Sequence, residues 1–154
     1  MSRSYLLIGG NSGIGKAFLD HQLNAGHHII ACSRTPDTSF SHPNLTQYAF
    51  DATDENSELS CPESIDGLIY MPGSIQLKPF HRIPLSAFRS EMEINLFGAI
   101  RTIQKALPAL KKGSNPSVVL FSTVAVQTGM PFHSGIASAK GAVEGLVRSL
   151  AAEY

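Results

Sequence analysis

The segment Gly9-Gly10-Asn11-Ser12-Gly13-Ile14-Gly15 has the residue types and spacing of a phosphate-binding turn. Its glycines let the backbone bend sharply and bring its amides close to a pyrophosphate. A helix behind the turn would add the positive end of its dipole. The turn follows an apolar run and precedes a segment of helical periodicity, which is the context that a dinucleotide-binding turn requires. We expect a bound dinucleotide, with an ordinary tight turn as the alternative. The expected contacts are Gly9, Asn11, Ser12, Gly13, Ile14 and Gly15.

The end of the second apolar run carries Ser33 and Arg34, at the place where a carboxylate would bind the adenosine ribose. An arginine there can instead pair with a 2′-phosphate through two hydrogen bonds, and a serine can donate another. The pattern therefore favours NADP(H) over NAD(H). A solvated Arg34, with cofactor choice set elsewhere, is the alternative. Asp51, after the third apolar run, is placed to accept from the adenine amino group or to cap a helix that follows it.

Apolar runs alternate with helix-period segments along the chain, which predicts an α/β fold with a Rossmann-type, doubly wound parallel sheet. We expect strands at 4–8, 28–33, 47–50, 65–71 and 117–121, and helices at 14–24, 85–112 and 137–153. The polar stretch after Asp51 predicts a helix of one turn or none. The run 117–121 is continuous and apolar, as in a strand covered on both faces. No closing strand follows the last helix, so we expect a fold truncated there.

The composition predicts one globular domain over residues 1–154. Hydrophobic residues make up 43% and charged residues 16%, with 12 Lys and Arg against 12 Asp and Glu. This balance argues against disorder, and zero net charge gives no footprint for nucleic acid or an anionic membrane. No apolar run approaches the roughly 18 residues of a membrane span, and none forms a signal-peptide core. The two cysteines and six histidines show no disulfide framework and no metal spacing. We expect a cytoplasmic domain without a metal.

Taken in order, these residues resemble the short-chain dehydrogenase/reductase family. The glycine turn, Asp51, Asn95 in Ile94-Asn95-Leu96-Phe97-Gly98 and Lys140 in Ser138-Ala139-Lys140-Gly141-Ala142 match its motifs across the whole chain. The resemblance implies a nicotinamide cofactor, a small carbonyl or alcohol substrate, and a dimer or tetramer. Lys140 would then bind the cofactor ribose, Gly73 would line the cofactor site, and Asn95 would hold a water relay through its backbone.

The resemblance fails at the acid/base position. The family has a tyrosine four residues before the lysine and a serine thirteen residues before that tyrosine; here these positions are Ile136 and Thr123. Thr123 keeps a hydroxyl, whereas Ile136 cannot exchange a proton, so we expect weak activity or none. His133 is a possible substitute acid. Ser122 is adjacent to Thr123, but it would point to the other side of a continuing strand.

Three functions stay open at this point. The first is an NADP(H)-dependent oxidoreductase of impaired activity, and the second is a non-catalytic NADP(H)-binding protein or sensor. The third is a fragment that needs a C-terminal half, because the family continues for two more strands. Asn95, Thr123 and Lys140 could also be purely structural. The family's dimer packing further implies a two-fold dimer that buries Phe97, Leu146 and Leu150.

Overall fold

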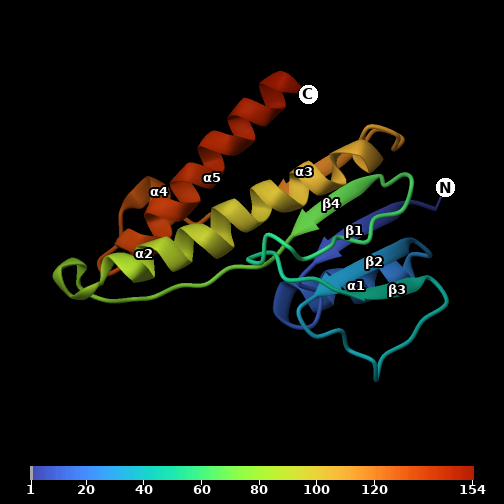
Figure 1. Cartoon of the computed structure of the whole chain (residues 1–154), viewed down its shortest axis with the longest axis horizontal. Helices are drawn as coiled ribbons and strands as arrows, with labels where there is room; N and C mark the ends of the chain where they lie inside the picture. The colour runs from blue at the N-terminus through green and yellow to red at the C-terminus, as the bar shows by residue number, and fades with distance from the viewer. Residues whose placement is uncertain (1) are drawn as a thin grey trace.

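The computed structural model describes residues 2–154 and contains a parallel sheet of five strands in the order β3-β2-β1-β4-β5 (Figure 1). The strands are β1 Ser4–Ile8, β2 His28–Ser33, β3 Leu45–Ala49, β4 Gly67–Tyr70 and β5 Ser117–Leu120. The helices are α1 Gly13–Asn24, α2 Leu85–Met92, α3 Gly98–Leu110, α4 Ala125–Thr128 and α5 Ser134–Glu153. A 3-10 turn, η1, spans Phe80–Arg82, and a π-helical segment, η2, spans Glu93–Phe97. The predicted Rossmann-type α/β fold is confirmed.

Strand side chains alternate between two apolar layers, one on each face of the sheet. Leu6 and Ile8 of β1 belong to the layer that contains Ile103 of α3. Leu7 belongs to the opposite layer, with Leu19 of α1. The three β1 side chains are at most 1% exposed, because helices cover both faces of this central strand. From β1 the chain continues to β2 and β3 on one side of the sheet and then to β4 and β5 on the other. The loops after β1 and β4 therefore run to opposite sides and leave room for a ligand between them.

The boundaries of several predicted elements differ from those in the structure. The helix predicted at 85–112 is three elements, because the π-helical segment η2 separates α2 from α3. The last helix begins at Ser134 instead of residue 137, and the loop before it contains the short helix α4. Between Phe50 and Asp66 the described chain forms turns without a helix, as its polar composition predicted.

β5 is not covered on both faces, which corrects the prediction from its apolar run. Val118 is 42% exposed and Val119 41%, and within residues 2–154 β5 pairs with β4 alone. The buried residues of α5 all lie in its first half, at Gly135, Ile136, Ala139 and Val143. Its second half diverges from α3 in Figure 1, although the partly buried Leu150 still packs against the apolar layer of Ile103. Val118 opens onto a groove whose other wall is the second half of α5, so β5 is only partly covered.

Candidate functional site

A cleft of about 640 Å³ opens at the carboxyl ends of the strands, where doubly wound sheets bind nucleotides. Every strand contributes to it through the residues that follow it. They are Gly9, Asn11, Ser12, Ile14 and Gly15 after β1, Ser33, Arg34 and Thr35 at the end of β2 and beyond it, Phe50 and Ala52 after β3, Met71, Pro72 and Gly73 after β4, and Phe121 and Ser122 after β5. The structure thus brings most of the predicted cofactor contacts to one cleft.

The glycine turn has the close backbone approach that its sequence predicted. Gly9 and Gly13 adopt φ values of +86° and +54°, in the left-handed region that favours glycine. A Cβ on Gly15 would overlap the carbonyl oxygen of Gly9 and lie 3.2 Å from its carbonyl carbon. Ser12 stands at the N-cap of α1 without a side-chain capping bond. The first turn of α1 therefore borders the cleft with amides that have no partner inside the helix, which suits an anion.

The loop after β2 is tied to the glycine turn. The side-chain amide of Asn11 donates to the carbonyl of Thr35 at 2.6 Å, so the exposed Arg34 is held beside the turn. Asp51 lies between two residues of the cleft lining and accepts from the amide and hydroxyl of Thr53 at 2.9 and 2.7 Å. These two bonds hold the pKa of Asp51 below its ordinary value, and the charge of Arg34 acts in the same direction. Asp51 caps a turn, since no helix follows it.

Asn95 is 1% exposed and lies in the π-helical segment η2. Its side-chain amide donates to the carbonyl of Glu91 at 2.9 Å and to that of Ser74 at 3.2 Å, while its Oδ1 has no partner. Segments of π-helix occur frequently at functional sites. Asn95 lies between α2 and α3, inside the helical stretch predicted at 85–112, but the change to π-helix was not predicted.

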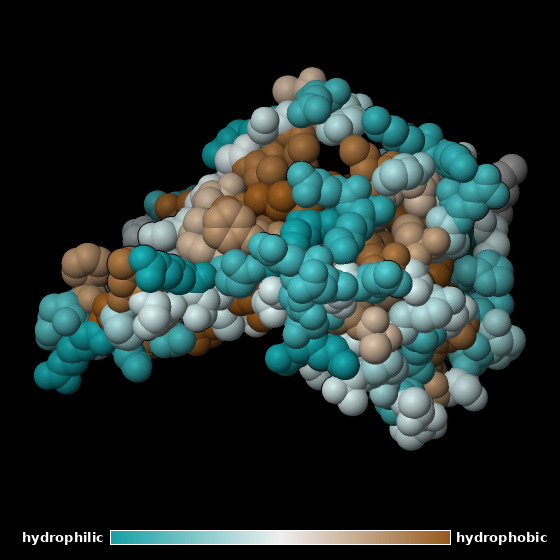
Figure 2. Space-filling view, in the orientation of Figure 1, coloured by the Kyte–Doolittle hydropathy of each residue, from teal (hydrophilic) through white to brown (hydrophobic). Residues whose placement is uncertain are grey.

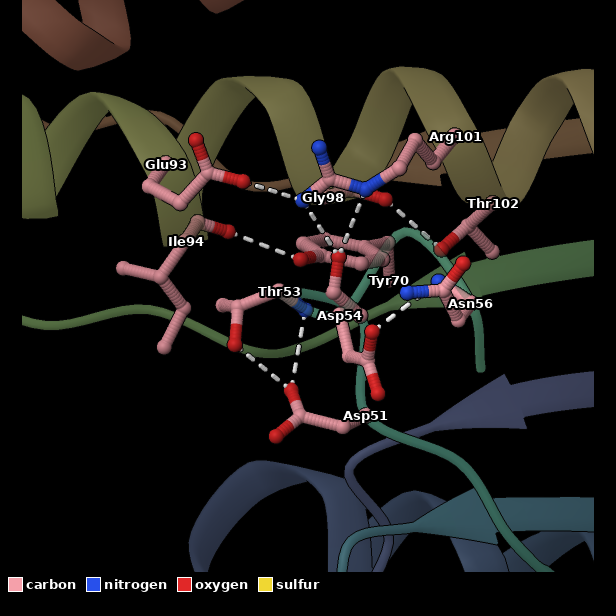
Figure 3. Close-up of polar contacts among 11 residues, drawn as sticks. Asp51, Thr53, Asp54, Asn56, Tyr70, Glu93, Ile94, Gly98, Arg101 and Thr102 are labelled. Carbon is pink, nitrogen blue, oxygen red and sulfur yellow. Dashed lines mark hydrogen bonds and ion pairs between the residues drawn. The ribbon is translucent and has the colours of Figure 1, made fainter. Parts of the chain in front are cut away.

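Buried polar contacts hold η2 against the sheet (Figure 3). The hydroxyl of Tyr70 on β4 donates to the carbonyl of Ile94 at 2.7 Å, and burial raises the pKa of Tyr70, which keeps this donor protonated. Arg101 donates to the carbonyl of Ala52 at 2.7 and 3.1 Å and pairs with Glu93. η2 is thus connected both to β4 and to the loop after β3.

Lys140 of α5 lies close to Gly73 and Asn95. A Cβ built on Gly73 would lie 2.9 Å from Asn95 Oδ1 and 3.9 Å from Lys140 Nζ. Burial lowers the pKa of Lys140, because the ammonium has lost part of its hydration. The structure therefore brings together three predicted site residues from the loop after β4, from η2 and from α5.

The residues predicted for proton transfer do not form one cluster facing the cleft. Thr123 is half-buried, and its Oγ1 accepts from the amide of Ala125 at 3.3 Å, which agrees with the alternative that it serves the loop backbone. Ser122 lines the cleft instead, and its hydroxyl donates to Glu144 at 2.6 Å. Ile136 is 5% exposed and is outside the cleft lining. His133 lies beside the carbonyl of Pro131, with its Nδ1 2.7 Å away.

One buried acidic side chain was missed from the sequence. Glu91 of α2 is 1% exposed and four residues before Asn95, a spacing that places both on one helical face. This four-residue spacing from Asn95 is the sequence feature that could have identified Glu91 as a site residue. Its contacts are described below.

Comparison with known proteins identifies the family. The sequence pattern described as short chain dehydrogenase matches residues 3–154. The chain belongs to the short-chain dehydrogenase family. It is 28% identical to oxidoreductase BOA17 of Botryotinia fuckeliana, over 99% of this chain and 61% of that protein. It is 30% identical to L-xylulose reductase of Mesocricetus auratus, over 98% of this chain and 65% of that protein.

The fold of this short-chain dehydrogenase chain agrees with solved structures. A short-chain dehydrogenase from Streptomyces avermitilis superimposes with a TM-score of 0.88 at 22% identity, over 99% of this chain and 61% of that one. The chain thus spans about three fifths of the length of the relatives described here. Members of this family bind NAD(P)(H), act on small molecules and commonly form oligomers.

Three further features concern the described part of the chain. No helix within residues 2–154 is long and apolar enough to cross a membrane. The same residues contain no group of three or more His, Cys, Asp or Glu side chains placed to hold a metal ion. Cys32 and Cys61 are free thiols, and burial raises the pKa of Cys32 to about 12, with the neighbouring Cys61 adding to the effect.

Proposed function

We propose that this chain is the cofactor-binding domain of an NADP(H)-dependent oxidoreductase that interconverts a carbonyl compound and an alcohol. The observation that carries the proposal is the cleft itself. Arg34 and Ser33 line it beside the glycine turn, and the end of β2 offers no carboxylate to a ribose 2′-hydroxyl. A guanidinium at that place favours a 2′-phosphate, and hence NADP(H). The nicotinamide ring supplies or accepts the hydride when the cofactor is bound.

The residues that line the cleft, together with Asp51 and Lys140 beside its lining residues, fit such a cofactor along its length. The unpaired first-turn amides of α1 suit the pyrophosphate, and the absence of a side chain at Gly15 permits the close approach of the turn. Asp51 is placed for the adenine amino group. At the other end, the ammonium of Lys140 is available to the nicotinamide ribose, with Gly73 leaving space beside it.

Proton transfer is the weak part of the proposed site. Reduction of a carbonyl needs a proton at oxygen, and general acid catalysis contributes roughly 10² to 10⁴ in rate. Ile136 cannot supply that proton, and its side chain is buried. We therefore propose slow catalysis. A non-catalytic sensor is the second candidate, supported by Ile136, but the oxidoreductase and reductase names of the relatives favour an enzyme.

We also propose a two-fold dimer in the cytoplasm, formed through η2, α3 and α5. Phe97 is 44% exposed, and Leu146 and Leu150 are half-buried. A groove of about 460 Å³ between α3, β5 and α5 is lined mainly by apolar side chains, and Figure 2 shows apolar surface gathered in this region. Leu150 lines this groove, and in the proposed dimer a second copy packed along the same helices would also bury Phe97 and Leu146.

The proposed function is tested by cofactor binding and then by turnover. The chain should bind NADPH at least about tenfold more tightly than NADH by calorimetric titration, as expected for one charge-assisted contact. In the natural full-length protein, NADPH oxidation with a panel of simple aldehydes and ketones should be slow or undetectable. Ile136→Tyr should raise that rate at least about a hundredfold.

Two results would contradict this proposal. Equal affinities for the two cofactors would remove the assigned role of Arg34. Turnover of several per second in the unmodified protein would show that another acid is present, and His133→Ala would then be expected to abolish it.

A further inference from the structure

Glu91 is an acidic side chain in the interior that forms no ion pair with another described residue. It is 1% exposed. Its Oε1 accepts from the backbone amide of Gln76 at 2.6 Å, whereas its Oε2 has no partner. Burying a carboxylate with one unpaired oxygen is costly, so the position of this group needs a physical reason.

The carboxyl group of Glu91 lies directly against the first turn of α5. A Cβ on Gly135 would overlap its Oε2 and lie 3.0 Å from its carboxyl carbon. The first amides of a helix have no intrahelical partner and carry the positive end of the dipole, which stabilises a nearby carboxylate. Ser134 adds a second buried and unpaired group at the same turn, its Oγ. Gly135 therefore leaves the space that the carboxyl group occupies.

Glu91 also connects this turn of α5 to the other segments around Lys140. Its carboxylate binds the loop after β4 through Gln76, and its backbone carbonyl accepts from the side chain of Asn95 at 2.9 Å. The same Asn95 amide donates to Ser74 in that loop. Gly73 lies in the same loop, next to both Asn95 Oδ1 and Lys140 Nζ. The side chain of Glu91 thus joins the loop after β4 to the start of α5, and its backbone carbonyl joins it to Asn95.

We propose that Glu91 is a positioning residue for the nicotinamide end of the dinucleotide cleft, an inference that rests on the proposed cofactor function. Its carboxylate holds the first turn of α5 against the loop after β4, and this sets the place of Lys140 beside Gly73. The adenosine end of the cleft, formed by the glycine turn and Arg34, does not depend on these contacts. Loss of Glu91 should therefore weaken the binding of the whole cofactor but not of its adenosine half.

The test compares NADPH with 2′,5′-ADP, which presents the adenosine half alone, by calorimetric titration of the chain. Glu91→Leu should weaken NADPH binding about tenfold and leave 2′,5′-ADP binding unchanged. Glu91→Gln keeps an acceptor for the amide of Gln76 and should restore most of the NADPH affinity. In a Lys140→Ala background, Glu91→Leu should have little additional effect, because both changes remove the same contact.

A second variant keeps the test decisive if Glu91→Leu does not fold. In the double variant Glu91→Ala with Gly135→Ala, the new methyl group at 135 enters the space left by the carboxyl group, and the same split between the two ligands is expected. Amide hydrogen exchange at Gln76 should accelerate in this variant and in Glu91→Leu, but not in Glu91→Gln.

Each outcome separates this inference from the proposed function. Equal weakening of NADPH and 2′,5′-ADP would show a general structural role and overturn the inference. Unchanged NADPH binding in Glu91→Leu would overturn it while the proposed function stands. Wild-type protein that binds neither ligand would overturn both.

Discussion

Replacement of Arg34 is the most direct test of cofactor choice. Arg34 is exposed in the cleft lining, and the bond from Asn11 to Thr35 holds its loop beside the glycine turn. A hydrogen bond to a charged group contributes about 1.5 to 3 kcal/mol, which corresponds to roughly ten- to hundredfold in affinity. Arg34→Gln should therefore weaken NADPH binding by about this factor and leave NADH binding almost unchanged.

Arg34→Asp should go further and invert the preference. The new carboxylate repels a 2′-phosphate and can accept from the 2′-hydroxyl of NADH, while Asp51 nearby adds to the repulsion. Arg89→Asp on the exposed side of α2 changes the net charge equally and is the matched control. Calorimetric titration of the three variants with both cofactors, at low and high salt, measures the effect. The reasoning is refuted if Arg89→Asp lowers NADPH affinity as much as Arg34→Asp does.

The remaining predictions concern the glycine turn, Lys140 and the dimer. Gly15→Ala should abolish dinucleotide binding, because the added Cβ overlaps the Gly9 carbonyl oxygen. Gly145→Ala is the control, because a Cβ there meets no atom within 4 Å outside the backbone of its own helix. It should stabilise the chain by about 0.5 to 1 kcal/mol in thermal unfolding. Lys140→Met should raise the melting temperature near neutral pH without cofactor, because burial disfavours the ammonium of Lys140. This gain in melting temperature over the wild type should shrink as the pH rises through the lowered pKa of Lys140. In that pH range the folded wild type loses its proton before the unfolded chain does, so the wild type becomes more stable. Light scattering at tens of micromolar should give a dimer mass, and Phe97→Asp should give a monomer; a wild-type monomer would contradict the proposed interface.

The glycine turn and the parallel sheet could be predicted from the sequence because both depend on neighbouring residues. The φ values of Gly9 and Gly13 are accessible to glycine without strain, and the apolar run of β1 needs cover on both faces. The same local reasoning was wrong for β5. Its apolar run predicts a covered strand, but whether an element covers it depends on the rest of the fold.

The sequence by itself predicted where a dinucleotide would bind and that one side chain, Arg34, would meet its adenosine end. Only the tertiary structure decided how the other end is built. The π-helical segment around Asn95 accepts a hydrogen bond from the hydroxyl of Tyr70, which is 24 residues away from the acceptor Ile94. The burial of Glu91 depends on the space at Gly135, far along the chain. Such pairs leave no local periodicity in the sequence, because each arises from segments that meet only when the helices pack on the sheet.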